Sequence, residues 1–407
     1  MFPPFSLFRP RSRRVHKTIV FISCLATLPQ KRRIFPIMSS PTAILGAGMM
    51  GTAIAAAHLR CGLPIILYDS ADAPLQTAPK RIADELRLQN LTLSSALLNC
   101  TGNLDDIVGC PILIETIPEK LNAKRKLYQK LTVTRKPDTF LFSNTSTISI
   151  SLLAQSMLPD WQARFCGFHF FHPVRQRSLV EIVPGRQTDA ATLDAAKEHA
   201  SRIEKRFIVV GDAPGFLVNR ILNPYLSSAL ALLERKVDLG RIERVALQFG
   251  MKMGPFRIMD EIGLDVVLHA GWVLHKAFPE RTPQSPILLK LIDQGKLGRK
   301  TGQGFMSYAR QTAWEGEGIP DPQFLSVENS VSESTISDSV MSDSGIVRSL
   351  FVPMYEEAVR CFEEGIISDL ASADMASIEA LGFPAEKGGI VTWGQLAYDG
   401  CKNLSIR

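Results

Sequence analysis

The chain has 407 residues, of which 45% are hydrophobic and 21% charged, a balance typical of globular proteins rather than of fibrous or disordered chains. Its formal net charge is +6, but residues 1–40 hold eight Lys and Arg and no Asp or Glu, so subtracting eight leaves −2 for residues 41–407. This excludes a basic surface for nucleic acid on the folded part. The sequence also lacks the apolar run of roughly 20 residues that crosses a membrane.

The first forty residues do not read as part of a folded domain. A basic stretch at 9–17 precedes an apolar stretch at 18–28, as in a short signal or transit segment. A start codon placed too early explains the same pattern, and we favour Met38 as the start. We therefore treat 1–40 as a leader or non-native extension. A cytoplasmic protein is expected, with the mitochondrial matrix as the alternative if the segment is a transit peptide.

The seven cysteines are scattered and include no C-x-x-C pair. This argues against a zinc site or a redox motif, so we expect no metal, and it agrees with a reducing compartment. Cys61, Cys110 and Cys166 lie in or beside apolar runs, where a thiol usually packs as a small hydrophobic group.

From residue 42 the chain alternates short apolar strands with helices. A strand at 42–45, a glycine turn at 46–51, a helix at 52–60 and a strand at 65–68 make one β-α-β unit. Further strands are expected at 111–115, 139–143, 164–169 and 179–183, with helices between them such as 120–131. The alternation predicts a mostly parallel sheet in a Rossmann-type α/β domain at 41–213.

From residue 214 onward, the sequence pattern predicts mainly helices. Amphipathic runs at 218–234 and 241–249, followed by a Gly-Pro break at 254–255, predict an all-α domain at 214–308. A serine-rich stretch then predicts a flexible linker at 309–345.

Residues 346–407 look like a second copy of the first helices. Three positions match at a constant offset of 129: Pro224 with Pro353, Glu234 with Glu363, and Val237 with Ile366. Each copy then runs through a second helix to a glycine break. We expect two helical repeats; chance similarity between amphipathic helices is the alternative.

The glycine turn has the pattern G-x-G-x-x-G between a strand and a helix. Gly46 permits the tight turn, Gly48 lets a pyrophosphate approach the backbone, and Gly51 lets the helix meet the strand. The N–H groups at the helix start favour phosphate. We therefore predict a dinucleotide site that also includes Met49 and Met50.

Asp69 ends the second strand, 18 residues beyond Gly51. A carboxylate there can accept hydrogen bonds from both ribose hydroxyls and would repel a 2′-phosphate. Residues 70–71 offer no Arg to reverse that preference. NAD rather than NADP is the expected cofactor, and the alternative is a glycine turn that serves packing alone.

An NAD enzyme that oxidises an alcohol needs a group that takes the hydroxyl proton, with a pKa near neutrality. His169 ends an apolar strand, and Glu181 lies twelve residues further on in the next strand. A carboxylate behind an imidazole fixes its tautomer and raises its basicity. The spacing alone does not exclude a purely structural role for His169.

Several motifs in one order resemble the L-3-hydroxyacyl-CoA dehydrogenase family, from about residue 42 to the C-terminus. These motifs are 46–51, Glu115-Thr116-Ile117-Pro118-Glu119 with Lys124, Ser143-Asn144-Thr145-Ser146, His169-Phe170-Phe171, Leu179-Val180-Glu181, Pro214-Gly215-Phe216 with Asn219-Arg220, Gly254-Pro255, and 298–305. The last segment resembles the second helical repeat of the fatty-acid oxidation multifunctional enzymes. The resemblance implies reversible, NAD-dependent oxidation of the 3-hydroxyl of a 3-hydroxyacyl or 3-hydroxybutyryl thioester, in fatty-acid metabolism.

The resemblance also implies residue roles. His169 would be the general acid/base and Glu181 its orienting partner, while Ser146 and Asn219 would hold the reacting oxygen and the thioester end. Near the cofactor it places three further residues: Glu115, Lys124 and Asn144. Plainer interpretations are a helix cap for Ser146, a turn for Asn219 and a solvated charge for Lys124. Because a second repeat can occupy a partner's place, we expect a monomer with an internal pseudo-dimer, or a weak homodimer.

Two departures from the family pattern affect the substrate. His172 stands where the family usually has Asn, beside the reaction centre. The stretch from Asp69 to Glu115 leaves little room for the helical hairpin that helps bind coenzyme A. An acyl carrier protein could therefore replace coenzyme A, and Arg175 and Arg177 could contact either one. A dehydrogenase of small hydroxy acids and a non-catalytic NAD-binding scaffold also stay open.

Overall fold

The computed structural model describes residues 40–134, 136, 138–283, 285–308, 318–321, 324 and 341–399. The expected leader, apart from Ser40, lies outside these residues, as do Cys24 and Cys401. The same is true of most of the expected linker, of which only 318–321, 324 and 341–345 are described.

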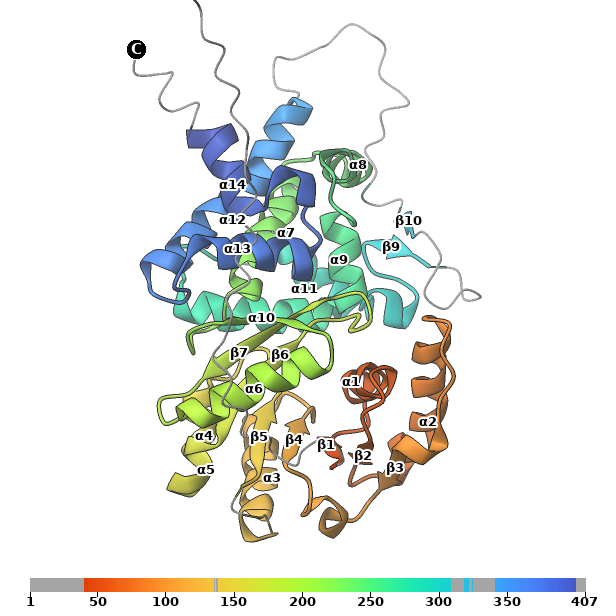
Figure 1. The fold of residues 1–407 in the computed structure, drawn as a ribbon. Coiled ribbons are helices and arrows are strands. Elements are labelled where there is room, and N and C mark those ends of the chain that lie inside the picture. Colours follow the sequence, from red (N-terminus) through yellow and green to blue (C-terminus); the bar gives the residue numbers. More distant parts are fainter. Residues whose placement is uncertain are drawn as a thin grey trace, which may run out of the picture. The chain divides into compact units, whose positions relative to one another are not determined.

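An eight-stranded sheet forms the centre of the first part of the chain (Figure 1). Its order is β3-β2-β1-β4-β5-β6-β7-β8, and every pair is parallel except β6 with β7. The strands are β1 (Thr42–Leu45), β2 (Ile65–Tyr68), β3 (Leu98–Thr101), β4 (Ile112–Glu115), β5 (Phe140–Ser143), β6 (Phe165–Phe170), β7 (Leu179–Pro184) and β8 (Arg206–Val209). The predicted Rossmann-type α/β fold is confirmed. Our prediction lacked β3 and β8, because Asn99 and Arg206 interrupt their apolar pattern.

Helices cover both faces of this sheet, and alternate side chains of each strand point to opposite faces. In β6, Cys166 and Phe168 pack into one core, and Phe165 packs into the other. One face carries α1 (Met49–Arg60), α2 (Asp72–Arg87) and α6 (Ala190–Arg202), and the other carries α3 (Leu121–Thr134), α4 (Ile150–Ala154) and α5 (Pro159–Ala163).

The connection from β2 to β3 contains one long helix, α2, and a short 3-10 turn at Ser95–Leu97. There is no second long helix there, which agrees with the short stretch seen in the sequence. α1 begins at Met49, three residues earlier than predicted. A helix that begins inside the glycine motif brings its first N–H groups closer to the turn.

The second part of the chain is helical. Its helices are α7 (Val218–Glu234), α8 (Leu239–Phe249), α9 (Pro255–Ile262), α10 (Leu264–Ala277), α11 (Pro286–Asp293), α12 (Asp343–Glu363), α13 (Leu370–Ala376) and α14 (Ile390–Gly394). Its shorter elements are 3-10 turns at Arg299–Thr301 and Ala385–Lys387, π turns at Ser377–Leu381 and Gln395–Asp399, and a ladder of β9 (Met306–Ser307) with β10 (Ile319–Pro320). A further 3-10 turn, Leu104–Ile107, lies in the first part of the chain, between β3 and β4.

α12 lies against α7 (Figure 1), and the two helical segments have the same order of elements. Each begins with a long helix that contains a proline and ends at a glutamate, Glu234 or Glu363. A further helical stretch then ends at a left-handed glycine, Gly250 or Gly382. The third helix follows another glycine, Gly254 or Gly389. This is the arrangement that two helical repeats predict.

Arg220 of α7 joins the two helical segments through buried charges. Its Nε lies 2.7 Å from Glu357 of α12, and its guanidinium also contacts Glu364 and the ring of Phe278. The Arg220 side chain is fully buried, so its charge is compensated by these carboxylates rather than by water. These buried contacts link α7 to α12 and to the residue that follows it.

A histidine pair joins α1 to α6 in the interior. His58 Nε2 lies 2.8 Å from His199 Nε2, and His58 Nδ1 lies 2.7 Å from the carbonyl oxygen of Ile54. His58 donates from Nδ1 to this carbonyl oxygen, so its Nε2 has the lone pair that accepts the proton of His199 Nε2, and His58 is neutral in this arrangement. Burial lowers the pKa of His58 to about 4 and holds that of His199 well below its ordinary value.

The histidine pair predicts a loss of stability in acid. In the unfolded chain these rings take up protons near pH 6.5, whereas the folded chain resists protonation, so the free energy of unfolding should fall as the pH drops from about 7 towards 4. His58 alone should contribute about 2 kcal/mol of this loss by pH 5. Urea unfolding at pH 7 and pH 5 measures it. In a His58→Leu variant the difference should shrink, and an unchanged difference would contradict the assignment.

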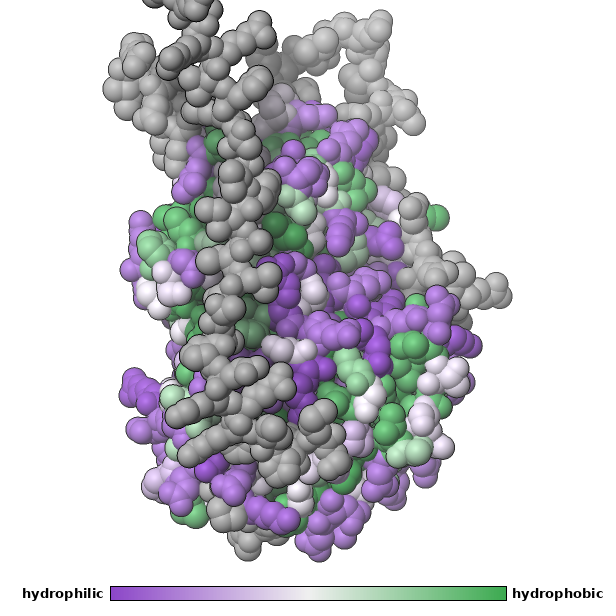
Figure 2. Space-filling model, viewed as in Figure 1, coloured by the Kyte–Doolittle hydropathy of each residue, from purple (hydrophilic) through white to green (hydrophobic). Residues whose placement is uncertain are grey.

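Figure 2 shows hydrophilic and hydrophobic residues interspersed over the visible face. Among the described residues, no helix has the length and apolar character needed to span a membrane.

Candidate functional site

The glycine turn between β1 and α1 is shaped by close backbone contacts. Gly46 has φ +113°, in the left-handed region, and its N–H donates to the carbonyl oxygen of Tyr68. A Cβ at Gly51 would lie 1.8 Å from the carbonyl oxygen of Gly46, whereas one at Gly48 would meet nothing within 4 Å. The open side at Gly48 and the absence of a side-chain cap on α1 leave backbone N–H groups for a phosphate. The turn therefore fits a dinucleotide.

Asp69 sits at the end of β2, beside this turn. Its Oδ2 accepts a hydrogen bond from the N–H of Ala47 at 2.8 Å, and its Oδ1 accepts one from Ala71 at 3.0 Å. Sequence reasoning missed Arg81 of α2, which donates to the carbonyl oxygen of Ala47 at 3.0 Å. No short-range pattern points to it, because only the packing of α2 brings it to the turn.

His169 and Glu181 are directly opposite each other in the antiparallel pair of β6 and β7. His169 Nδ1 lies 2.7 Å from Glu181 Oε2, and both side chains are buried. The other carboxylate oxygen accepts hydrogen bonds from the N–H groups of Leu217 and Val218, at 3.0 and 2.8 Å. Glu181 therefore holds the imidazole and the start of α7 at once.

Ser146 and Asn219 complete the cluster. The Ser146 Oγ lies 3.1 Å from His169 Nε2, and Asn219 Nδ2 donates to the Ser146 carbonyl oxygen at 3.1 Å. The rings of Phe171 and Phe216 meet the imidazole edge-on; the sequence analysis quoted both within motifs but gave them no role. The structure thus brings together four predicted residues from β6, β7, the β5–α4 loop and α7.

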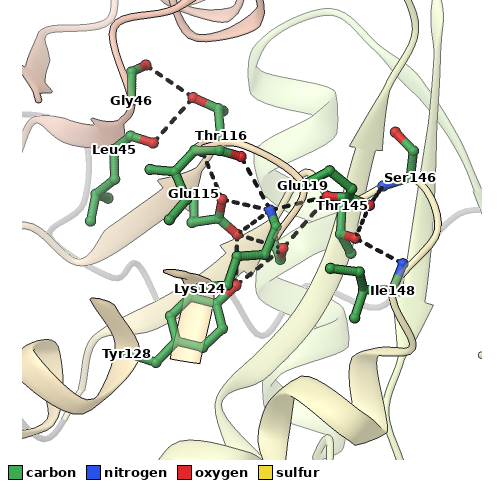
Figure 3. Close-up of polar contacts among 12 residues, drawn as sticks. Leu45, Gly46, Glu115, Thr116, Glu119, Lys124, Tyr128, Thr145, Ser146 and Ile148 are labelled. Carbon is green, nitrogen blue, oxygen red and sulfur yellow. Dashed lines mark hydrogen bonds and ion pairs between the residues drawn. The ribbon is translucent and has the colours of Figure 1, made fainter. Parts of the chain in front are cut away.

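Glu115 and Lys124 form a buried ion pair, as Figure 3 shows. Lys124 Nζ lies 2.7 and 2.9 Å from the two Glu115 oxygens, and Tyr128 and Ser143 donate to the same carboxylate. Both members of the pair are almost fully buried, Lys124 at 1% exposure and Glu115 at 0%. Their direct contacts hold α3 against β4 and β5.

Asn144 and Glu119 fix the loop that follows β5. Asn144 Oδ1 accepts a hydrogen bond from the N–H of Phe170 at 2.8 Å, which joins the ends of β5 and β6. Glu119, which sequence reasoning quoted without a role, accepts hydrogen bonds from Thr145, Ser146 and Thr147. Its place at the end of the motif that begins at Glu115 was the signal in the sequence that could have identified it.

The loop after His169 holds one departure from the family pattern, His172, and the two arginines that could contact coenzyme A or a carrier protein. Burial, together with Arg175 and Arg177, lowers the pKa of His172 to about 4, so this imidazole is neutral near pH 7. Arg175 Nη1 lies 3.3 Å from Glu85 of α2, and Arg177 is only 8% exposed. Neither arginine is therefore an exposed side chain. Both line a cavity of about 200 Å³ between this loop, α1 and α2.

The chain matches two family models. The NAD binding domain of 3-hydroxyacyl-CoA dehydrogenase matches residues 41–213, and the C-terminal domain of 3-hydroxyacyl-CoA dehydrogenase matches residues 215–308. The alpha subunit of the fatty acid oxidation complex of Pseudomonas aeruginosa is 34% identical over 363 residues, which cover 86% of this chain and 50% of that subunit. The chain thus spans about half the length of the curated relatives it matches.

Solved structures similar to this chain agree with the family-model matches. (S)-3-Hydroxybutyryl-CoA dehydrogenase from Ralstonia eutropha is 32% identical with a TM-score of 0.61, covering 66% of this chain and 99% of its own. 3-Hydroxybutyryl-CoA dehydrogenase from Escherichia coli covers 88% of this chain and 91% of its own with a TM-score of 0.71; at 23% identity it shows the shared fold. Both family models together match most of the sequence, so the chain belongs to the NAD-dependent 3-hydroxyacyl-CoA dehydrogenase family.

Proposed function

We propose that this chain catalyses the reversible NAD-dependent oxidation of the 3-hydroxyl of a 3-hydroxyacyl-CoA to the 3-ketoacyl-CoA, in fatty-acid metabolism. The observation that carries the proposal is the hydrogen-bonded cluster of Glu181, His169, Ser146 and Asn219. Family membership and the named relatives support the substrate class. We further propose the organisation given by the sequence, with an NAD-binding domain at 41–213, a helical domain at 214–308 and a second repeat at 346–407.

The chemistry follows from the tautomer of His169 that its contacts favour. Because the Glu181 carboxylate accepts from Nδ1–H, the proton resides on Nδ1 and the lone pair of Nε2 faces Ser146. Nε2 takes the hydroxyl proton during oxidation, and Glu181 stabilises the resulting imidazolium. In reverse, the imidazolium protonates the ketone oxygen.

Ser146 and Asn219 act on the oxygens of the substrate. The Ser146 hydroxyl, within 3.1 Å of Nε2, can hydrogen-bond the reacting oxygen while His169 moves the proton. Asn219 reaches the same place from α7 and can donate to the thioester end. When bound, NAD supplies the two-electron acceptor of the oxidation, and the glycine turn, Asp69 and the α1 N-terminus hold it.

Turnover of acetoacetyl-CoA tests this function. We expect NADH absorbance to fall when the protein, NADH and acetoacetyl-CoA are mixed, and to rise with NAD and 3-hydroxybutyryl-CoA. A panel of chain lengths identifies the preferred acyl group. No turnover with any CoA thioester, in a protein that binds NADH, would overturn the proposal and leave the non-catalytic scaffold.

The second candidate substrate is the same acyl group on an acyl carrier protein. It is favoured by the single helix α2 in place of a hairpin, because less protein is then available to hold coenzyme A. Arg175 pairs with Glu85, however, and Arg177 is buried, so neither forms a free basic surface for an acidic carrier. A higher kcat/KM for the carrier-bound substrate than for acetoacetyl-CoA would favour this candidate.

Asp69 should set the preference for NAD. In an Asp69→Ala variant we expect KM for NADH to rise about 10-fold, because the hydrogen bonds to the ribose are lost, and KM for NADPH to fall because the repulsion of its phosphate is removed. Steady-state kinetics with both cofactors measures the change. Asp72→Ala, at the exposed first position of α2, is the control. An unaltered NADH to NADPH ratio would contradict the assignment.

We also propose a monomer with an internal pseudo-dimer, or a weak homodimer, in the cytoplasm or in the mitochondrial matrix. The packing of α12 along α7 and the buried Arg220–Glu357 contact support the pseudo-dimer. Mass measurement in solution tests it, and a tight dimer would count against it.

A further inference from the structure

The cavity of about 200 Å³ lies between α1, α2, residues 175–178 of the loop between β6 and β7, and the two residues before β8. α1 and α2 lie side by side (Figure 1). Ala53 and Ala57 of α1 form its apolar wall, and the other side chains that line it are polar. Since one water molecule takes about 30 Å³ of liquid, the cavity has room for a tetrahedral oxyanion such as phosphate.

Four of the charged side chains that line the cavity already form ion pairs. Arg60 pairs with Glu204, and Arg175 Nη1 lies 3.3 Å from Glu85. The side chains of Arg60 and Glu204 are 28% and 65% exposed, so the cavity is open to ions from their side. The other charged side chains in the described lining are both cations, and the lining therefore has an excess of positive charge.

Arg177 is the first of these two cations. It is only 8% exposed, its Nε has no hydrogen-bond partner, and its guanidinium forms no ion pair among the described residues. A Cβ built on Gly382 would lie 3.3 Å from its Nη1, so the second helical segment closes this side. An arginine side chain stays charged in a protein, and a buried charge without a partner is costly. Arg177 therefore lacks a counter-ion.

Lys205 is the second cation, and it is also 8% exposed. Its Nζ donates to the carbonyl oxygens of Val174 and Arg177, at 2.6 and 2.5 Å. Burial and the charge of Arg60 lower the pKa of Lys205 to about 8, so the amine is still mostly protonated at pH 7. An ammonium group has three N–H donors. Two of them bind the loop, and the third is left for a ligand.

We propose that this cavity binds a phosphate-type oxyanion, held by the guanidinium of Arg177 and the ammonium of Lys205. An oxyanion compensates both buried charges, and a guanidinium can donate to two of its oxygens at once. The site is separate from the glycine turn, because Ala57 lies eight residues beyond Met49 on α1, or about 12 Å along the helix. Inorganic phosphate and a phosphate group of coenzyme A offer the same chemistry.

Thermal unfolding of the full chain tests the site, with saturating NADH to occupy the glycine turn. We expect the wild-type Tm to be about 2–4 °C higher in about 20 mM sodium phosphate than in sodium chloride of equal ionic strength. In Arg177→Met this increment should fall below about 1 °C. Without phosphate, the Tm of Arg177→Met should equal or exceed that of the wild type, because an apolar side chain replaces an uncompensated charge. Equal phosphate increments in the two proteins would overturn the proposal.

Two further variants isolate the cavity. Arg164→Met removes one positive charge at the Arg164–Asp138 pair, which does not line the cavity, and it should keep the full increment. Ala57→Glu places a carboxylate in the cavity where the anion would lie, and it should lose the increment. A general effect of phosphate on folding would act alike on all the variants. A full increment in Ala57→Glu would contradict the site even if Arg177→Met fails to fold.

Isothermal titration calorimetry measures the binding directly. Inorganic phosphate added to the NADH complex should bind with a Kd on the order of 1 mM in the wild type and in Arg164→Met, and about 10-fold or more weakly in Arg177→Met. Neither a heat of binding nor a Tm increment in the wild type would overturn the proposal.

Competition identifies the source of the phosphate. If adenosine 3′,5′-bisphosphate, which has the adenosine phosphates of coenzyme A, raises the apparent Kd for inorganic phosphate, the site receives a phosphate of the substrate. If the apparent Kd is unchanged, the ligand is the free ion. Both measurements are made without turnover, so a protein that is inactive with every thioester defeats the proposed function and leaves the anion site standing.

Discussion

Replacing His169 by Gln should lower kcat about 10²–10⁴-fold, the range typical of a lost general acid/base. Gln has nearly the length of the imidazole and can still contact Glu181, but it cannot take up a proton. The buried position of His169, between Phe171 and Phe216, leaves little room for water to substitute. Stopped-flow or steady-state measurement of acetoacetyl-CoA reduction provides the value.

Cofactor binding gives the control for His169→Gln. The glycine turn and Asp69 lie at β1 and β2 and have no hydrogen bond to His169 among the described residues, so the Kd for NADH should change little. A variant with wild-type kcat would remove His169 from its role. A variant that fails to bind NADH would show a folding defect instead, and circular dichroism would detect it.

Replacing Glu181 should separate catalysis from folding. In Glu181→Gln the side-chain oxygen can still accept from the N–H groups of Leu217 and Val218, but the amide presents N–H to His169 Nδ1. The imidazole then places its proton on Nε2 and can no longer act as a base there. We expect kcat to fall about 10²–10⁴-fold with stability close to that of the wild type.

The Glu181→Ala variant should lose both catalytic activity and folding stability. It leaves two buried N–H groups at the start of α7 and the imidazole without an acceptor, which should cost about 3 kcal/mol of the free energy of unfolding. Urea unfolding and steady-state kinetics of the two variants together measure the separation. Equal stability of Glu181→Ala and Glu181→Gln would contradict the link between Glu181 and α7.

The catalytic cluster and the histidine pair respond to pH for different reasons. The loss of stability expected in acid arises at His58 and His199, between α1 and α6, which have no hydrogen bond to His169 or Glu181 among the described residues. Activity measured in acid should therefore be corrected for unfolding. A His58→Leu variant should need a smaller correction, because it removes one of the two titrating groups without changing a hydrogen bond of His169.

Local pattern was sufficient for the nucleotide-binding part of the fold. Glycine is needed at 46, 48 and 51 because of the local backbone geometry, which the sequence pattern reveals directly. Gly46, for example, has the positive φ that its turn needs. Strands such as β1 and β2 were placed to the residue, because their side chains are buried on both faces and the apolar run has no interruption. β3 and β8 were missed because they lie at the two edges of the sheet, where polar residues are tolerated.

The reaction site could be predicted only in part from the sequence. His169, Glu181, Ser146 and Asn219 were named through a family resemblance, and their spacing in sequence gives no distance between them. The cross-strand register of β6 and β7 sets His169 opposite Glu181, and only the docking of α7 brings Asn219 to Ser146. Their catalytic roles stay predictions.

The sequence by itself determined the Rossmann-type fold, the NAD preference and the family, because each depends on residues close together in the chain or on several ordered motifs. The tertiary structure decided which charges meet. It paired Lys124 with Glu115 in the interior, buried Arg177, and set Glu119 against the Ser146 loop. Such contacts depend on the packing of separate elements. The distance between two residues on different elements cannot be read from local sequence patterns, because only the folded chain brings them together.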